Sequence, residues 1–234
     1  MSLLLACFVS IGSVSLISCG SDDDDDNNNN DPTTSDFDSH AVDLGLPSGT
    51  LWADQNLGAN TPEDYGNYYA WGEVESKSNY SWENYKYGEE HSLTKYVPQS
   101  LASQIGLNGF YDDKSVLEKT DDAAATVLGG KWRTPSYEEW KELSEQCTWT
   151  WATVNDINGS YVTGPNGNSI FLPAAGGYNG PTLRFPGFGG AYWTTSYEEE
   201  NPSSASYFYF RSGSIYFDKS SRYFGRSIRP VRNK

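Results

Sequence analysis

Cysteine and histidine are scarce in this chain of 234 residues, which has three cysteines and two histidines. Cys7 and Cys19 lie in and just after an apolar N-terminal stretch, so Cys147 alone is left for a folded domain and an intradomain disulfide is excluded. With only His40 and His91 available, a histidine-rich metal centre is also excluded. A Ser-His-Asp triad is disfavoured, because His91 lies in a polar, glutamate-rich stretch without a nucleophile elbow.

Positive charge is missing from the first part of the chain, where no Lys or Arg precedes Lys77. Residues 20–38 carry eight acids, no base and almost no hydrophobic side chain, so they cannot repay the entropy of folding and are predicted to form a solvated tether. Without these acids, 23 acidic against 16 basic residues leave a net charge near −7. Nucleic acid is therefore not an expected partner. Residues 211–234 are locally positive, and we expect them to pair with acids elsewhere on the fold.

Residues 2–18 form an apolar run that is too short to cross a membrane and is typical of an export signal. The sequence Leu16-Ile17-Ser18-Cys19 resembles the lipobox of bacterial lipoproteins. That resemblance implies that residues 1–18 are a signal peptide, that Cys19 is acylated after cleavage, and that lipid alone anchors the protein. The usual basic start of such a signal is missing, which a translation start further upstream would explain.

The acidic stretch after Cys19 resembles the surface-export signal of Bacteroidetes lipoproteins. This resemblance implies a lipid-anchored protein of the outer membrane that is exposed at the cell surface. We therefore divide the chain into a signal peptide (1–18), an acylated and disordered acidic tether (19–40) and a globular domain (41–234).

The clearest secondary-structure signal lies in residues 130–143, GKWRTPSYEEWKEL. Ser136 followed by Glu139 is a capping box, which predicts a helix that begins at Ser136. The helix is expected to serve as the element around which the sheets pack. Cys147, at its end, is interpreted as a small buried hydrophobe and not as a nucleophile. The predicted apolar face consists of Tyr137, Trp140, Leu143 and Cys147.

Several shorter patterns predict a mixture of helix and hairpins. Residues 123–128 are expected to form a short helix, capped by Asp121 and Asp122 and stopped by two glycines. Asn158-Gly159 and Asn166-Gly167 are turn signals, and the second lies between two segments of a predicted hairpin.

Residues 206–211 and 214–218 alternate in a way that is typical of two strands. The alternation places Phe208, Phe210, Ile215 and Phe217 on one face. The other face, together with the two residues that follow, is our candidate ligand-binding patch: Tyr207, Tyr209, Arg211, Tyr216, Asp218, Arg222 and Tyr223. An ordinary solvated sheet face is the alternative interpretation of the same pattern.

Six sequence blocks, in order, resemble the Fibrobacter succinogenes major paralogous domain: VDLGLPSGTLWADQNLGA, PEDYGNYYAWGE, WRTPSYEEWKEL, TGPNGNSIFLPAAG, AYWTTS and GRSIRPV. The likeness covers residues 42–232, and a more distant one is to formylglycine-generating sulfatase-modifying proteins. Both imply an α+β, C-type-lectin-like fold with two short helices, small antiparallel sheets, long irregular loops and termini close together. The matched positions imply structural roles for Trp132, Arg133, Ser136, Glu139, Trp140 and Arg229, with both arginines paired inside the protein.

These resemblances also limit the chemistry. The formylglycine-generating proteins use two active-site cysteines and copper, which Cys147 alone cannot provide. Calcium-dependent lectins of this fold use a Glu-Pro-Asn loop and a Trp-Asn-Asp strand, and this chain has neither. We therefore expect no metal, no cofactor and no catalytic residue, and predict a surface binding module whose partner is a glycan or a protein.

Two other classes stay open. Glu73, Glu75 and Glu83 lie among aromatic residues, and a pair of carboxylates is sufficient for glycoside hydrolysis, so a surface glycan-processing enzyme is one alternative. A structural envelope protein is the other. Lectin-like domains of retroelement-diversified systems also end in variable strands, and a reverse transcriptase with a near-repeat template beside the gene would identify that class.

Overall fold

The structure is a computed structural model that describes residues 37–103 and 109–234. The predicted signal peptide, Cys19 and the tether up to residue 36 lie outside the described residues. No helix in the described part of the chain is long and apolar enough to cross a membrane.

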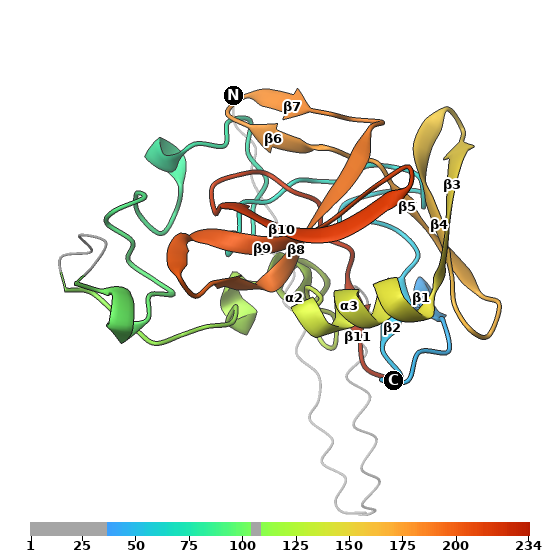
Figure 1. The fold of residues 1–234 in the computed structure, drawn as a ribbon, viewed down its shortest axis with the longest axis horizontal. Helices are drawn as coiled ribbons and strands as arrows, with labels where there is room; N and C mark the ends of the chain where they lie inside the picture. Colours follow the sequence, from blue (N-terminus) through green and yellow to red (C-terminus); the bar gives the residue numbers. More distant parts are fainter. Residues whose placement is uncertain (1–36, 104–108) are drawn as a thin grey trace, which may run out of the picture. The chain divides into compact units, whose positions relative to one another are not determined.

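The described residues form an α+β structure in which every sheet is small and antiparallel (Figure 1). One sheet joins the two ends of the domain, with order β1 (Ala41–Asp43), β2 (Leu51–Ala53) and β11 (Val231–Arg232). A second contains β3 (Thr148–Val154), β4 (Ile157–Thr163) and β5 (Ser169–Pro173). The third has order β10 (Ser214–Ser221), β9 (Asn201–Arg211) and β8 (Gly189–Glu198), and β6 (Gly177–Asn179) pairs with β7 (Thr182–Arg184).

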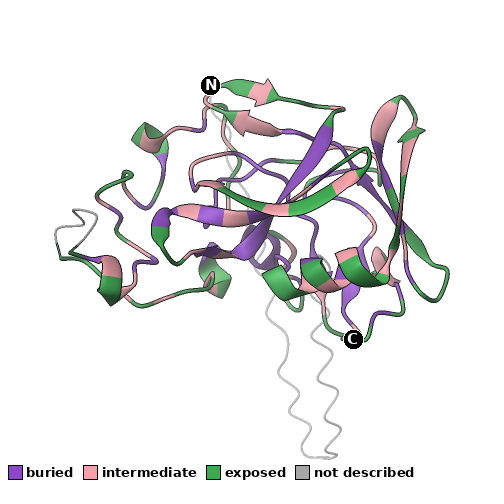
Figure 2. Cartoon of the chain, in the orientation of Figure 1, coloured by how far each residue is buried: buried purple, intermediate pink, exposed green. Residues whose placement is uncertain are grey.

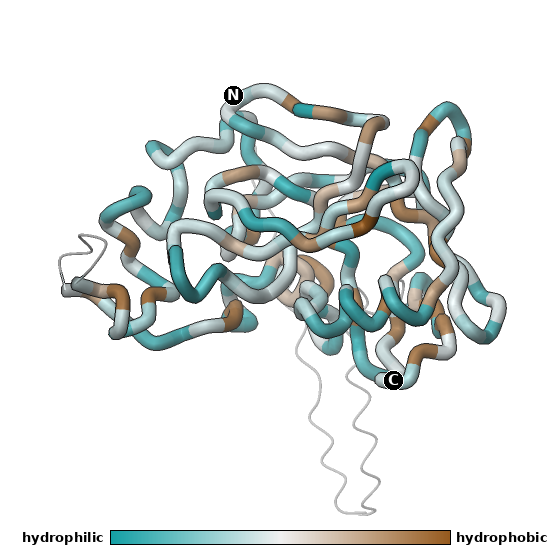
Figure 3. The backbone as a smooth tube through the Cα atoms, in the orientation of Figure 1, coloured by the Kyte–Doolittle hydropathy of each residue, from teal (hydrophilic) through white to brown (hydrophobic). Residues whose placement is uncertain are grey.

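Two α-helices occur in the described residues, α2 (Ala123–Leu128) and α3 (Tyr137–Gln146). Short 3-10 helices lie at η1 (Trp82–Asn84), η2 (Gln99–Leu101) and η3 (Lys119–Asp121). The predicted capping box of α3 is confirmed: Ser136 Oγ accepts from the Glu139 N–H at 3.2 Å, and the Glu139 carboxylate accepts from the Ser136 N–H at 2.9 Å. The side of α3 seen in Figure 3 is mainly hydrophilic.

The buried face of α3 packs against β8 and β9. Trp140 is fully buried, stacks on Phe208 with ring centroids 4.5 Å apart and meets Trp52 edge-on at 4.7 Å. Leu143 is also fully buried, while Tyr137 is partly exposed and Cys147 is half-buried. The prediction of a helix around which sheets pack is therefore confirmed for this half of the core.

A second buried cluster, which the sequence analysis did not predict, lies away from α3 and contains the tyrosine-rich segment 65–97. This segment has no named strand, and several of its hydrogen bonds to distant carbonyls come from tyrosine hydroxyls. Tyr68 donates to the Ala175 carbonyl at 2.7 Å, and Tyr80 donates to the Tyr68 carbonyl at 2.7 Å. Phenol groups thus satisfy buried carbonyls that a sheet would otherwise satisfy.

The pairing of β9 with β10 confirms the predicted alternation, since Tyr209 lies opposite Tyr216 and Phe208 opposite Phe217. Figure 2 shows β8 buried and β10 largely open to solvent. Two residues depart from the predicted faces: Ile215 is 37% exposed although it shares its face with fully buried Phe208, and Tyr207 on the opposite face is buried in the second core cluster.

The hairpin at Asn166-Gly167 is confirmed between β4 and β5. The turn predicted at Asn158-Gly159 is wrong, because both residues lie inside β4 and pair with β3. The chain turns instead at Asn155 and Asp156, which take φ of 46° and 65°. Asn and Asp tolerate this left-handed conformation better than most residues.

The helix-capping prediction is confirmed for Asp122 and wrong for Asp121. Asp122 accepts from the N–H groups of Ala124 and Ala125. Asp121 lies in η3 and accepts from the Tyr87 and Tyr96 hydroxyls, at 2.6 Å each, and from Lys95. Asp121 therefore links η3 to the irregular segment that contains Tyr87, Lys95 and Tyr96.

Contacts with the domain begin before the boundary predicted at residue 41. Phe37 packs edge-on against Trp132 with ring centroids 5.1 Å apart, and Asp38 accepts a 2.9 Å hydrogen bond from Trp132 Nε1. His40 pairs with Asp54 at 2.9 Å. The last residues of the predicted tether therefore belong to the domain.

Replacing Trp140 with Ala should lower the free energy of unfolding by about 3–5 kcal/mol, because it leaves a large cavity in the aromatic core. Val127→Ala is the control, since Val127 is 53% exposed and its loss should cost less than about 1 kcal/mol. Unfolding by denaturant, followed by a circular dichroism signal of the backbone that does not depend on tryptophan, measures both free energies. Equal costs for the two variants would contradict the central packing role of Trp140.

Asp121 should make the free energy of unfolding depend on pH in the acidic range. Burial acts to raise the pKa of its carboxyl, but hydrogen bonds from Lys95, Tyr87 and Tyr96 outweigh it and the pKa is lowered. A lowered pKa stabilises the fold above the unfolded-state value of ~3.9, and this contribution is lost as pH falls through the folded-state pKa. Asp121→Asn should therefore cost roughly 1–3 kcal/mol at pH 7 and flatten the stability curve below about pH 4. Wild-type and variant curves that stay parallel from pH 6 to pH 2 would contradict this.

Candidate functional site

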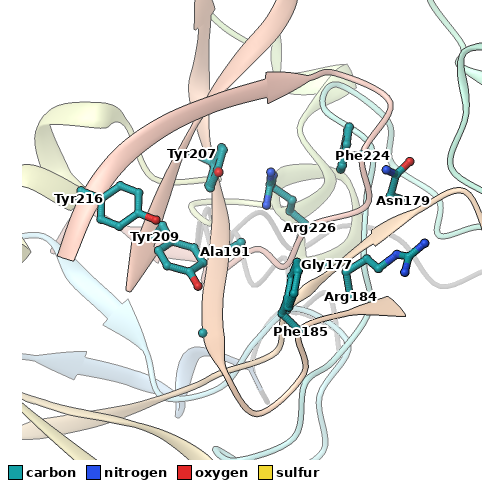
Figure 4. A pocket seen from close by; sticks show the side chains of 12 residues that line it. Gly177, Asn179, Arg184, Phe185, Ala191, Tyr207, Tyr209, Tyr216, Phe224 and Arg226 are labelled. Carbon is teal, nitrogen blue, oxygen red and sulfur yellow. The ribbon is translucent and has the colours of Figure 1, made fainter. Parts of the chain in front are cut away.

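Three residues of the predicted patch line one pocket of about 480 Å³ beside the β8–β9–β10 sheet (Figure 4). They are Tyr207, Tyr209 and Tyr216, which come from the outward face of β9 and β10. In Figure 4, Tyr209 and Tyr216 lie at one side of the pocket, Arg184 and Asn179 lie at the other, and Arg226 and Phe185 lie between them. The remaining lining residues are Gly176, Gly177, Gly189, Ala191 and Phe224.

Small residues on β8 make room for the tyrosine side chains. Ala191 lies opposite Tyr209 in the sheet, and a Cβ added at Gly189 would lie within about 2.4 Å of the Tyr209 hydroxyl. Any larger residue at 189 would displace that phenol ring. The Tyr209 and Tyr216 rings contact each other with centroids 5.0 Å apart, so they form a continuous aromatic wall.

The turn Phe185-Pro186-Gly187-Phe188 places aromatic rings in solvent at the pocket's edge. Phe188 N–H donates to the Phe185 carbonyl at 3.1 Å, and Gly187 has the positive φ of 76° that suits this position of a turn. Phe185 is 71% exposed and has a φ of 56°, which is costly for a non-glycine residue. Exposed aromatic side chains on strained backbone are a recurrent feature of binding sites.

Arg226 is the most buried charged group in the pocket, with 8% of its surface exposed. Its guanidinium carbon lies 3.5 Å from the centroid of the Tyr207 ring. Nε and Nη2 both donate to Ser220 Oγ, at 3.2 Å and 2.8 Å. Burial lowers the pKa of Arg226 to about 10. The group therefore stays charged at neutral pH while it is largely removed from water.

Two other predicted patch residues support the pocket without lining it. Asp218 accepts a 3.0 Å hydrogen bond from the Tyr207 hydroxyl. Burial raises the pKa of Tyr207 to about 12, so the phenol keeps its proton. Tyr223 is half-buried and packs between Trp82, at 5.2 Å, and Phe224, at 4.8 Å.

Arg211 belongs to a separate pocket of about 290 Å³. There it lies with Trp149 and Trp151, which occupy alternate positions of β3. Of the seven residues of the predicted patch, three thus line the first pocket, one lines the second, and three line neither.

Arg222 does not contribute to any outward face, which corrects the prediction that it binds ligand. It is fully buried, and its guanidinium lies 4.7 Å from the Trp71 ring and 4.9 Å from the Tyr197 ring. Nη1 and Nη2 donate to the carbonyls of Lys95 and Tyr96. Burial by a distant loop, which sequence alternation cannot show, accounts for this difference.

The residues predicted to be structural lie in the interior or in paired contacts. Arg133 makes two 2.6 Å hydrogen bonds with the Glu139 carboxylate. Arg229 is fully buried and donates to Asn56, Ala53 and Phe171. Trp132 is also buried.

The carboxylates considered for catalysis are partly brought together. Glu73 and Glu75 line a pocket of about 430 Å³, which Glu83 does not line. Glu73 is held by Lys77, at 2.6 Å, and by the Lys86 N–H, at 2.7 Å. Within residues 37–103 and 109–234, no three His, Cys, Asp or Glu residues are grouped so as to hold a metal ion.

Comparisons with protein-family models, with curated proteins and with solved structures find no match to this chain. The site therefore has to be interpreted from its own residues.

The sequence analysis missed six side chains that line the pocket: Asn179, Arg184, Phe185, Ala191, Phe224 and Arg226. Arg226 lies in the block GRSIRPV, in which the sequence analysis assigned a role only to Arg229. The Phe-Pro-Gly-Phe sequence at 185–188 was the available signal, because Pro-Gly predicts a turn and a turn places flanking side chains at the surface.

Cys147 should react slowly with thiol reagents. Burial raises the pKa of its thiol to about 11. Since the thiolate is the reactive form, native protein at pH 8 should be alkylated at Cys147 roughly a hundred times more slowly than a free cysteine with a pKa of ~8.5. Mass spectrometry of the peptide that contains Cys147 measures this rate, with denatured protein as the control. Equal rates in native and denatured protein would restore Cys147 as a candidate nucleophile.

Proposed function

We propose that this chain is a lipid-anchored, surface-exposed protein whose domain binds a ligand without transforming it. The single observation that carries the proposal is the pocket lined by Tyr207, Tyr209 and Tyr216. It combines a buried Tyr207, a half-buried Tyr209 and an exposed Tyr216 with two arginines, and none of its lining residues is an acid or a histidine. Such a lining provides contact area and hydrogen-bond donors, but no group that is suited to transfer protons at neutral pH.

We propose a C-type-lectin-like fold for the domain. The pairing of β2 with both β1 and β11 joins the two ends of the domain in one sheet. Two helices, small antiparallel sheets and a long irregular segment between β2 and α2 accompany it. These features agree with the resemblance to the Fibrobacter succinogenes major paralogous domain, which also motivates the binding role.

The proposed location is the outer membrane of a bacterium, with acylated Cys19 as the anchor and the acidic tether as the spacer. It is supported by the lipobox-like sequence and by the acidic composition of residues 20–38. The expected partner is a surface glycan or a protein, and not nucleic acid. We propose no resident cofactor.

A glycan-processing enzyme is the second candidate, and the observation that favours it is the shared pocket of Glu73 and Glu75. Two contacts from Lys77 and the Lys86 N–H already occupy the Glu73 carboxylate, which disfavours proton transfer by that group. A glycan array combined with a reducing-sugar assay on the purified protein separates the classes. Binding without turnover is the expected result, and turnover would identify an enzyme. If the protein shows neither binding nor turnover, a structural envelope role is left.

Tyr209→Ala should weaken binding to the best array glycan by about tenfold, because it removes half of the aromatic wall. Arg211→Ala is the matched control from the neighbouring pocket and should change affinity by less than about threefold. Isothermal titration calorimetry measures both. The reverse ranking would move the site to the pocket of Trp149 and Trp151, and unchanged affinity in both variants would remove the predicted patch from consideration.

A further inference from the structure

Three arginines of one C-terminal segment, Arg222, Arg226 and Arg229, are buried in the domain. None of the three forms an ion pair with an acid of the described residues. A buried cation is costly unless its donors are satisfied. The three side chains can therefore be compared by the acceptors that each guanidinium finds.

All three guanidinium nitrogens of Arg229 and both Nη atoms of Arg222 find acceptors within the protein, while Arg222 Nε has no partner among the described residues. Arg222 donates to two backbone carbonyls, at 3.0 Å and 2.8 Å. Arg229 donates to two backbone carbonyls and to the Asn56 side chain, at distances between 2.8 Å and 3.1 Å. Neither side chain lines the pocket of Tyr207 and Tyr209.

Arg226 differs from the other two. Its guanidinium donors at Nε and Nη2 share one neutral acceptor, Ser220 Oγ. Nη1 lies beside Gly177, where an added Cβ would be 3.6 Å away, and both residues line the pocket. A desolvated guanidinium with so few acceptors, at the wall of an open cavity, is suited to bind an anion from outside.

The rest of the lining agrees with an anionic ligand. Besides Arg226 it contains Arg184, which is exposed, and no acidic residue. The charged residues of the lining are thus both positive although the chain has a net charge of −15, and Asp218 acts electrostatically on Arg226 from outside the lining. Nearby Asp218 lies outside the lining and is hydrogen-bonded to the Tyr207 hydroxyl.

We infer that the pocket binds an anionic glycan, with a carboxylate or sulfate of an acidic sugar on Arg226 and Arg184. A neighbouring sugar ring packs its apolar face on the Tyr209–Tyr216 wall or on Phe185. This inference rests on the proposed binding function and specifies its ligand.

A glycan fits these observations better than an acidic peptide. Peptides that bind to sheets usually pair their backbone with an open strand edge. Here the pocket is lined by side chains of β9 and β10 and by the Phe185 turn, with flat aromatic faces on two sides. Such faces suit the CH groups of a sugar ring, and the guanidinium fork suits a planar carboxylate.

The test is isothermal titration calorimetry of the purified protein against four probes of similar length. They are an oligogalacturonate, its fully methyl-esterified form, a chondroitin sulfate oligosaccharide and oligoglutamate. We expect at least tenfold tighter binding of an acidic saccharide than of the methyl ester, with affinity that falls as salt rises. Because chondroitin sulfate carries carboxylates as well as sulfates, tighter binding of the third probe than of the first would show that sulfate adds to recognition, and equal binding would show that carboxylates suffice.

Arg184→Ala should weaken binding of the acidic saccharide about tenfold and leave the methyl ester within about threefold. Lys141→Ala, which removes one charge from the exposed face of α3, is the matched control and should change neither. Arg226→Lys keeps the charge and loses the fork, so it should also weaken acidic binding. Circular dichroism reports whether the Arg226→Lys variant folds. If it does not fold, the Arg184→Ala variant alone tests whether the pocket binds the acidic saccharide.

The outcomes separate this inference from the proposed function. Equal or tighter binding of the methyl ester overturns the anionic specificity and leaves a glycan-binding module. Binding of oligoglutamate alone overturns the glycan class in favour of a peptide. Acidic binding that Arg184→Ala leaves unchanged overturns this pocket as the site. If none of the probes binds, the inference is overturned. If the glycan array also shows no binding, the proposed function is overturned as well.

Discussion

Burial of guanidinium groups in the segment from Arg222 to Arg229 constrains the rest of the structure. Each buried cation has lost most of its hydration, so the fold has to supply acceptors or aromatic faces around it. Arg222 obtains them from the loop at residues 95–96, and Arg229 obtains them from residues 53 and 171. Segments that are far apart in the sequence are therefore fixed around one C-terminal strand-and-loop segment. Arg226 obtains the face of the Tyr207 ring, one serine hydroxyl and an open cavity.

Tyrosine hydroxyls are the second means by which the irregular part of the chain is ordered. The segment before α2 contains few regular elements, yet its phenols reach carbonyls and carboxylates deep in the core. Because a tyrosine contributes both apolar area and one hydrogen bond, a loop rich in this residue can be packed without strands. This packing also supports the pocket. Tyr68 contacts Tyr178 edge-on at 4.9 Å, and Tyr178 lies in β6, whose other two residues line the pocket.

Local signals in the sequence were sufficient for part of this account. The capping box at Ser136, the burial of Trp140 and the faces of β9 and β10 all follow from contacts within a few residues or from simple alternation. The sequence could not separate Arg222 from Arg226, because the carbonyls that Arg222 meets lie more than a hundred residues away and the cavity at Arg226 is formed by several separate segments. The turn at Asn155 was missed for a related reason: Asn158-Gly159 is the stronger local turn signal, but strand pairing with β3 prevails there.

The most direct test of the account is a crystal structure of the protein bound to an oligogalacturonate. The account predicts a carboxylate within hydrogen-bond distance of Arg226 Nη1 and a sugar ring against the Tyr209–Tyr216 wall. A saccharide bound against Trp149 and Trp151, or one whose carboxylates all point into solvent, would contradict it.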